Sequence, residues 1–287
     1  MVKSFGSRGD KIFDFGLNFF LILVLVVTIV PLSYVVIISL APLVLPGQPR
    51  SIISFGAYTE LLAQPSFLRA ALNSFVLLVG GVTLNMVLTT LSAFALSRKS
   101  LPGRGVILAF ILFTFLFNAG LIPQFLLIKN LGLLDSLPSV ILPGAISVYN
   151  LLIMIAFLQN LPESLGEAAR IDGASEFQVL WYVMLPLSKP ILLTVGLFYA
   201  VNNWNEFFLP ILFLSDKDLM PLPVVLRDIL SSLNSAEFVD GNRQASIAPP
   251  EAIKMAAVVL TTLPMLMVYP WIQSHFTKGV LLGGVKE

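Results

Sequence analysis

Residues Glu167 to Pro186 read EAARIDGASEFQVLWYVMLP and form a polar island in a very apolar chain. Gly173 follows the first Glu by six positions, and the stretch closes on Leu185-Pro186. A largely apolar protein has little reason to keep such a segment in water unless something soluble binds there. We therefore expect this stretch to meet a soluble partner.

The composition around this island is that of a membrane protein. The chain has 287 residues, of which 57% are hydrophobic and 11% charged, and its mean hydropathy is +0.91. Soluble domains usually have about 25% charged residues. A net charge of +1 argues against a nucleic-acid partner, which needs a concentrated basic face. Because there is no Cys and only one His, His275, we expect neither a metal site nor a His-based catalytic triad, and we interpret His275 as an interfacial residue.

Four charge-free intervals and two further apolar runs predict six membrane-spanning helices, since a span needs about 20 mainly apolar residues. They lie near residues 17–40, 72–96, 106–127, 138–158, 191–213 and 252–273. The prediction is an all-α polytopic protein with one transmembrane domain over residues 1–287. Its two long connections would be a loop at 159–190, which holds the polar island, and an outer loop at 215–251.

The distribution of Lys and Arg predicts that both chain ends are cytoplasmic. An even number of spans puts both ends on one side. With these ends inside, the inner segments hold ten Lys and Arg and the outer ones seven. The cluster Arg98, Lys99 and Arg104 beside two spans favours this orientation more strongly than the totals do. The polar island then lies in the cytoplasm.

Within the island the residue order predicts a short helix, a Gly turn and a second helix. Ser164 followed by Glu167 fits a capping box, and Gly173 suits the left-handed residue that closes a helix. Ser175 with Gln178 fits a second box, opening a helix that Pro186 ends. From this pattern alone, a docking site and an amphipathic hairpin lying on lipid headgroups are equally acceptable.

The same stretch resembles the EAA loop of ABC-importer permeases: E-A-A, three residues, Gly, nine residues, Ile, one residue, Leu-Pro. Glu167-Ala168-Ala169, Gly173 and Leu185-Pro186 are in register, and Val183 replaces the Ile. The resemblance implies the type I ABC-importer permease fold, with the first short helix as a coupling helix seated in a cleft of an ATPase subunit. By this resemblance, the contact and hinge positions are Glu167, Ala168, Ala169 and Gly173.

The chain itself has no Gly-x4-Gly-Lys-Ser/Thr phosphate-binding loop. We therefore expect a transport subunit rather than an enzyme, with no cofactor of its own. ATP and Mg²⁺ would bind to the partner ATPase subunits.

A second polar group lies in the predicted fifth span, where Asn202-Asn203-Trp204-Asn205-Glu206 precedes Pro210. We expect Pro210 to break the helix and free backbone carbonyls toward a cavity. Polar groups at membrane depth usually face a cavity or a neighbouring helix. Amides that bond hydroxyls and a ring that stacks on a pyranose suit a sugar path, whereas hydrogen bonding between helices is the competing interpretation. Tyr149 and Asn150 in the fourth span are further candidates for the path.

The run Trp204–Pro210 and the tail Gly279–Glu287 resemble the carbohydrate-uptake branch of these permeases, specifically the six-span subunit similar to the second maltose permease. Phe117–Ser136 resembles the subgroup for plant or algal oligosaccharides, often acidic. The resemblance implies a bacterial cell-membrane importer of a carbohydrate. Its partners would be a homologous second permease, two ATPase subunits and an extracytoplasmic solute-binding protein.

Two alternatives remain open from the sequence. One is an ion-coupled secondary transporter that uses Glu206, the only acidic residue within the six predicted spans. The energy source separates it from an ABC importer. The other is an ABC permease for a non-sugar solute, which ligand binding would distinguish.

Overall fold

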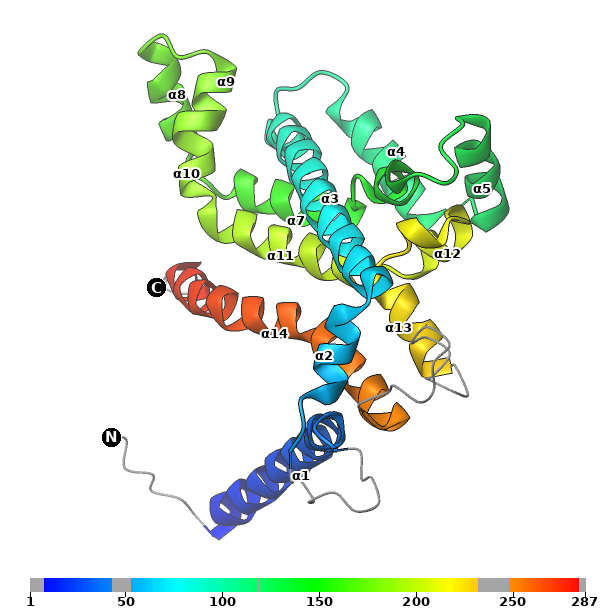
Figure 1. Ribbon diagram of the computed structural model, residues 1–287. Helices are drawn as coiled ribbons and strands as arrows, with labels where there is room; N and C mark the ends of the chain where they lie inside the picture. Colours follow the sequence, from blue (N-terminus) through cyan, green and yellow to red (C-terminus); the bar gives the residue numbers. More distant parts are fainter. Residues whose placement is uncertain (1–7, 43–52, 118, 232–247, 284–287) are drawn as a thin grey trace, which may run out of the picture. The chain divides into compact units, whose positions relative to one another are not determined.

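The computed structural model describes residues 8–42, 53–117, 119–231 and 248–283, and every regular element within them is a helix (Figure 1). Residues 232–247 of the predicted outer loop lie outside the described residues. The chain divides into two compact units. One comprises Met1–Gln64 and Asp228–Thr261, and the other comprises Pro65–Arg227 and Thr262–Glu287.

The first unit contains the predicted first span. Helix α1 (Arg8–Ser39) covers it and includes Pro31. The next described helix is α2 (Gly56–Ala63). The hydroxyls of Ser39 and Tyr58 share a hydrogen bond of 2.6 Å. The buried Ser39 hydroxyl thus has a partner, which fixes the end of α1 against α2. Helix α13 (Leu222–Ser231) and helix α14 (Pro250–Gly283) each contribute residues to both units.

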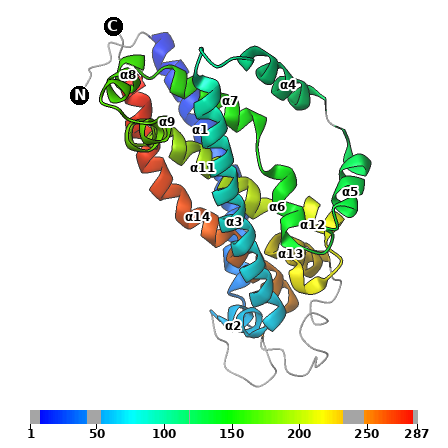
Figure 2. The same ribbon diagram turned by 90° about the horizontal axis from the view of Figure 1, so that it is seen from above.

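Three helices make the core of the second unit: α3 (Pro65–Ser97), α7 (Val148–Gln159) and α11 (Lys189–Asn205). Both views show them side by side (Figures 1 and 2), and α4 (Arg104–Leu116) packs against α7. Their buried cluster consists of Ala93, Leu96, Leu151, Met154, Ile155, Leu158, Ile191, Val195 and Tyr199. This cluster is the platform from which the polar loop projects.

Three of the predicted spans are broken. The break in the fifth was expected from Pro210, whereas the breaks in the third and fourth correct the sequence interpretation. The third becomes α4 and α5 (Leu121–Asn130). The fourth becomes α6 (Leu137–Ile141), the 3-10 helix η1 (Leu142–Gly144) and α7, with a bend of 48°. The fifth becomes α11 and α12 (Phe208–Phe213).

The reasons for the breaks are local and do not alter the mean hydropathy. Gly120 has φ +87° at the start of α5. In the fourth span Ser147 caps α7 by accepting a hydrogen bond from the Asn150 amide. In the fifth, Pro210 follows Glu206 by four residues, and a proline ring clashes with the carbonyl at that offset. The mean hydropathy of a span does not reveal any of these local features.

The break in the fourth span is closed by side chains from the two neighbouring core helices. Asn85 donates to the carbonyls of Gly144 and Ala145 at 2.6 and 2.9 Å. The Tyr199 hydroxyl accepts the Ser147 amide at 2.9 Å and shares a 2.7 Å hydrogen bond with the Thr89 hydroxyl. Backbone groups freed inside a membrane need such partners. The break is therefore a built feature of the fold.

Among the described residues, three helical segments are long and apolar enough to cross a bilayer: Asp14–Ser39, Pro65–Ser97 and Pro250–Met267. Three bent pairs raise the number to as many as six if each pair is one span. The polar loop between α7 and α11 contains α8 (Glu163–Ile171), α9 (Glu176–Gln178), the π-helix η2 (Val179–Met184) and α10 (Leu185–Leu187). A 3-10 turn, η3 (Lys217–Leu219), precedes α13.

Candidate functional site

The polar loop begins at Pro162, and this corrects the first predicted capping box. Helix α8 starts at Glu163 with Pro162 as its N-cap and no side-chain cap. Ser164 thus lies inside the first turn, where its hydroxyl is not at the cap position. The fixed backbone angle of proline suits the start of a helix, but Pro162 has no side-chain acceptor for the first amides of α8.

The turn after α8 has the predicted glycine in the predicted conformation. Gly173 has φ +85°. Its amide donates to the Arg170 carbonyl at 3.0 Å, and the Ala174 amide donates to the Ala169 carbonyl at 2.9 Å. This pair of bonds is a Schellman motif, which needs a left-handed residue where Gly173 stands. The motif satisfies the last carbonyls of α8 and reverses the chain.

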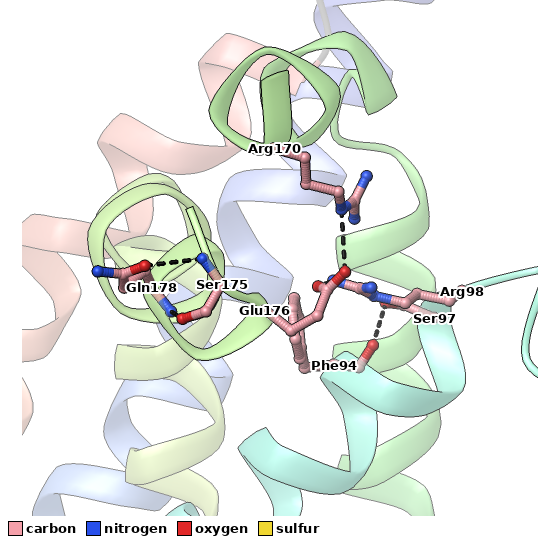
Figure 3. Close-up of polar contacts among 7 residues, drawn as sticks. All are labelled: Phe94, Ser97, Arg98, Arg170, Ser175, Glu176 and Gln178. Atoms are coloured by element: carbon pink, nitrogen blue, oxygen red, sulfur yellow. Dashed lines mark hydrogen bonds and ion pairs between the residues drawn. The ribbon is translucent and has the colours of Figure 1, made fainter. Parts of the chain in front are cut away.

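The second capping box is confirmed. The Ser175 amide donates to Oε1 of Gln178 at 2.7 Å, and the Gln178 amide donates to the Ser175 hydroxyl at 3.4 Å (Figure 3). The helix does not end at Pro186 as predicted, because it continues through η2 and α10 to Leu187. It then turns by 84° into α11.

Helix α8 presents one packed face and one open face. Gly166 is buried, and a Cβ there would lie 3.4 Å from Cε of Met184 in η2. Glu167, Ala168 and Gly173 are exposed, and Ala169 is half-buried. The four predicted docking positions therefore lie together on the loop, and three of them are open to a partner.

The sequence analysis missed the most exposed apolar residue of this loop. Ile171, in the last turn of α8, is 86% exposed. On η2, the Trp181 ring stacks on Phe177 with centroids 6.2 Å apart, and both rings are exposed. Exposed apolar side chains beside a charged helix end are typical of an interaction surface. The only sequence signal that could have identified Ile171 is its place as an apolar residue at the end of a polar helix.

A cluster of charges ties the loop to α3 and was also missed. Glu176 accepts a hydrogen bond from Nε of Arg170 at 3.0 Å and is paired through its other oxygen with Nη2 of Arg98 (Figure 3). The bond from Arg98 is the main reason that the pKa of Glu176 lies below its ordinary value of 4.5. Partial burial acts in the opposite direction, and Arg170 adds to the lowering. Arg98 and Glu176 are 78 positions apart, so no local spacing indicates the pair.

The second predicted group, in the fifth span, does not converge on one place. Asn203 donates to Oδ1 of Asn85 at 2.9 Å, which is the interhelical bonding kept as the competing interpretation. Trp204 is buried, whereas Asn202 and Asn205 are exposed. In the fourth span Asn150 is buried at the start of α7, and its neighbour Tyr149 is exposed.

Glu206 has a structural role at the break between α11 and α12. Its Oε1 accepts the amides of Phe208 and Leu209, each at 3.0 Å. These are the first amides of α12, which have no partner within the helix. The carboxylate thus caps a short helix.

The broken helix core and the exposed, capped loop together define a membrane transport subunit that meets a soluble partner. The chain belongs to the family described as binding-protein-dependent transport system inner membrane component, whose model matches residues 3–281. It is therefore the permease subunit of an ABC importer.

Two relatives from Bacillus subtilis (strain 168) cover nearly the whole chain. Protein LplC is 39% identical over 287 residues, which is 98% of this chain and 97% of LplC. The polygalacturonan/rhamnogalacturonan transport system permease protein YtcP is 39% identical over 284 residues, 96% of this chain and 99% of its own.

A solved structure also matches along the full length. It is a crystal structure of a bacterial ABC transporter involved in the import of the acidic polysaccharide alginate. A chain of it is 32% identical to this one with a TM-score of 0.87, covering 96% of this chain and 100% of its own. The predicted all-α permease fold is confirmed.

Proposed function

We propose that this chain is one of two membrane subunits of an importer that carries an acidic oligosaccharide into a bacterial cell. The observation that carries the proposal is the full-length similarity to the permease YtcP and to the alginate importer, because the polysaccharides for which both are named contain uronic acids. Non-sugar solutes find no support among these relatives.

The substrate class is testable with a matched pair of sugars. The assembled complex, reconstituted in proteoliposomes with its binding protein, is given trigalacturonate or its fully methylated ester, in which each charged carboxylate becomes a neutral methyl ester. We expect ATP-dependent uptake of trigalacturonate and little uptake of the ester. Equal uptake of both would leave an oligosaccharide importer without charge selectivity, and uptake of neither would reject the substrate class.

The second part of the proposal is that α8 is the docking element for a partner ATPase. Its supports are the open face formed by Glu167 and Ala168, the half-buried Ala169 and the Schellman turn at Gly173. Small side chains let a partner backbone approach closely, and Glu167 offers a carboxylate. The partner subunits would hold ATP and Mg²⁺, since the sequence has no phosphate-binding loop.

The remaining partners are a homologous second permease, a second ATPase copy and an extracytoplasmic binding protein. The family description itself supports the binding protein. Both chain ends and the loop at 159–190 would lie in the cytoplasm. Among the path candidates, we retain Asn202, Asn205 and Tyr149, which are exposed and so accessible to a passing sugar.

The ion-coupled alternative rested on Glu206. Its carboxylate oxygen accepts hydrogen bonds from two backbone amides of α12, which gives the side chain a fixed structural role. A coupling carboxylate must instead change its partners during each cycle. This geometry favours an importer driven by ATP.

A further inference from the structure

A cleft of about 560 Å³ separates the docking loop from the core helices of the second unit. Phe94, Ser97 and Arg98 at the end of α3 line one side of it, and Gly166, Glu167 and Arg170 of α8 line another. Glu167 belongs to the proposed docking face of α8. A displacement of α8 by the ATPase therefore reaches α3 only if a contact across the cleft transmits it.

The carboxylate of Glu176 bridges the cleft. It lies at the start of α9, pairs with Arg98 on α3 and accepts a hydrogen bond from Arg170 on α8 (Figure 3). One carboxylate thus joins the last turn of the docking helix to the end of a core helix. The two guanidinium groups use different oxygens, so both contacts exist together.

Arg98 is held in place before it meets Glu176. Its guanidinium carbon lies 4.5 Å from the centroid of the Phe94 ring, which belongs to the preceding turn of α3. Only 25% of its side chain is exposed, against 54% for Glu176. A stacked, partly buried guanidinium is a rigid attachment point, because it has few alternative positions.

We propose that Glu176 and Arg98 form a strut that transmits the displacement of α8 to α3 when the ATPase closes, so that both are positioning residues for transport. The inference rests on the proposed docking of α8. Exposed ion pairs contribute little to folding stability, so the pair is better suited to transmitting motion than to holding the fold. Arg170 locks α8 to the same carboxylate and makes the loop and strut move as one body.

A distance measurement tests the strut without any substrate. Because the chain has no Cys, spin labels can be placed at Ser164 on α8 and Leu91 on α3, both of which are exposed. In the complete complex we expect one label-to-label distance, unchanged between the resting state and the state trapped with ATP and vanadate. In Glu176→Gln we expect the distance to change on trapping. Glu163→Gln, a carboxylate lining the same cleft, is the matched control and should behave as wild type. An unchanged distance in Glu176→Gln would overturn the strut.

A covalent replacement gives the functional test. Arg98→Cys with Glu176→Cys removes the ion pair, and a short bis-maleimide restores a link between the two positions. For the trisaccharide that the wild-type complex takes up, we expect the open double variant to move at least about fivefold fewer molecules per ATP, the lower end of common coupling between sites. Cross-linking should recover the ratio, a result that a purely structural role does not predict.

The outcomes separate the strut from the docking proposal. If Glu167→Lys keeps its ATPase subunits and full coupling, docking at α8 is wrong. If Glu176→Gln loses its ATPase subunits as a docking variant does, Glu176 belongs to the docking surface and the strut is wrong. Retained ATPase subunits with lost coupling, rescued by the cross-link, supports the strut.

Discussion

Single glycines carry two of the sharpest constraints in this protein, and each has a matched glycine elsewhere that lacks the constraint. At Gly173 the constraint is the backbone angle, since φ is +85° while the space for a Cβ is open. At Gly81 it is space, because a Cβ would lie 2.5 Å from Nδ2 of Asn203. The two constraints predict different failures.

Replacing Gly173 by Val should uncouple transport. A side chain in the left-handed region costs roughly 1–2 kcal/mol, and more when β-branched, so the turn that closes α8 opens. We expect about a 5–30-fold loss of docking-competent loops, measured as ATPase subunits co-purified with the membrane complex. Gly105→Val, at an open position without positive φ, is the control. Equal ATPase content in both variants contradicts the docking proposal.

Replacing Gly81 by Ala should break the hydrogen bond from Asn203 to Asn85. The Asn203 amide must turn away, which leaves a buried acceptor unpaired and lowers the free energy of unfolding by about 1–3 kcal/mol. Thermal unfolding of the purified complex measures this. Gly80→Ala is the control, because its Cβ would meet Cδ1 of Ile141 at an ordinary 3.6 Å. An equal effect of the two substitutions would contradict the assigned contact.

At the scale of elements, several polar contacts lie at the ends of helices rather than in their interiors. Glu206 caps α12, Ser175 and Gln178 cap α9, and the Arg98–Glu176 pair joins the end of α3 to the start of α9. Each of these is a polar contact at a place where the backbone changes direction. The same few contacts at helix ends therefore set the path of the backbone and take part in the proposed function.

The structural role of Glu206 predicts that transport is driven by ATP rather than by a proton gradient. Glu206→Gln keeps an oxygen that can accept the two amides, so ATP-driven uptake should persist with the proton gradient collapsed. Glu206→Leu removes the acceptor and should destabilise the start of α12 by about 1 kcal/mol. Uptake into proteoliposomes with an uncoupler present is the measurement. If wild-type uptake stops under these conditions, the protein is ion-coupled.

The ion pair between Glu176 and Arg98 is expected to depend on pH. Its pKa is lowered by Arg98 and then by Arg170, so the pair contributes fully above the ordinary value of 4.5 and is lost as the pH falls through the lower folded value. A ¹³C titration of the carboxyl group in the complex should give a pKa below 4.5. Arg98→Met should raise it toward that value, and no change would contradict the pair.

At the scale of the whole molecule, the predicted orientation has a direct test. The absence of Cys allows single labels at Ser164 in the polar loop and Lys217 in η3, both exposed. An impermeant thiol reagent should label Lys217→Cys in intact cells and Ser164→Cys only after the membrane is opened. The reverse pattern would invert the topology.

The sequence predicts what depends on neighbours along the chain. The left-handed Gly173 and the Ser175–Gln178 box follow from spacings of a few residues, and they are present. The break in the fifth span follows from Pro210, but those in the third and fourth were missed because hydropathy averages over the residues that cause them. Asn85, the partner of Asn203, lies 118 positions away, so the sequence left interhelical bonding as one of two interpretations and did not identify the partner.

Two tryptophans of this chain differ strongly in their exposure to solvent. Their intrinsic fluorescence can therefore report on the loop and on the core separately. Trp181 is 57% exposed on the loop, while Trp204 is 6% exposed in the core. Water shifts indole emission to longer wavelengths and admits a soluble quencher, so the two contribute separable bands once the third tryptophan, Trp271, is replaced by Phe. Arrival of an ATPase at the loop should then shield the red band from iodide and leave the blue band unchanged, so that engagement of the motor can be followed in real time without a dye.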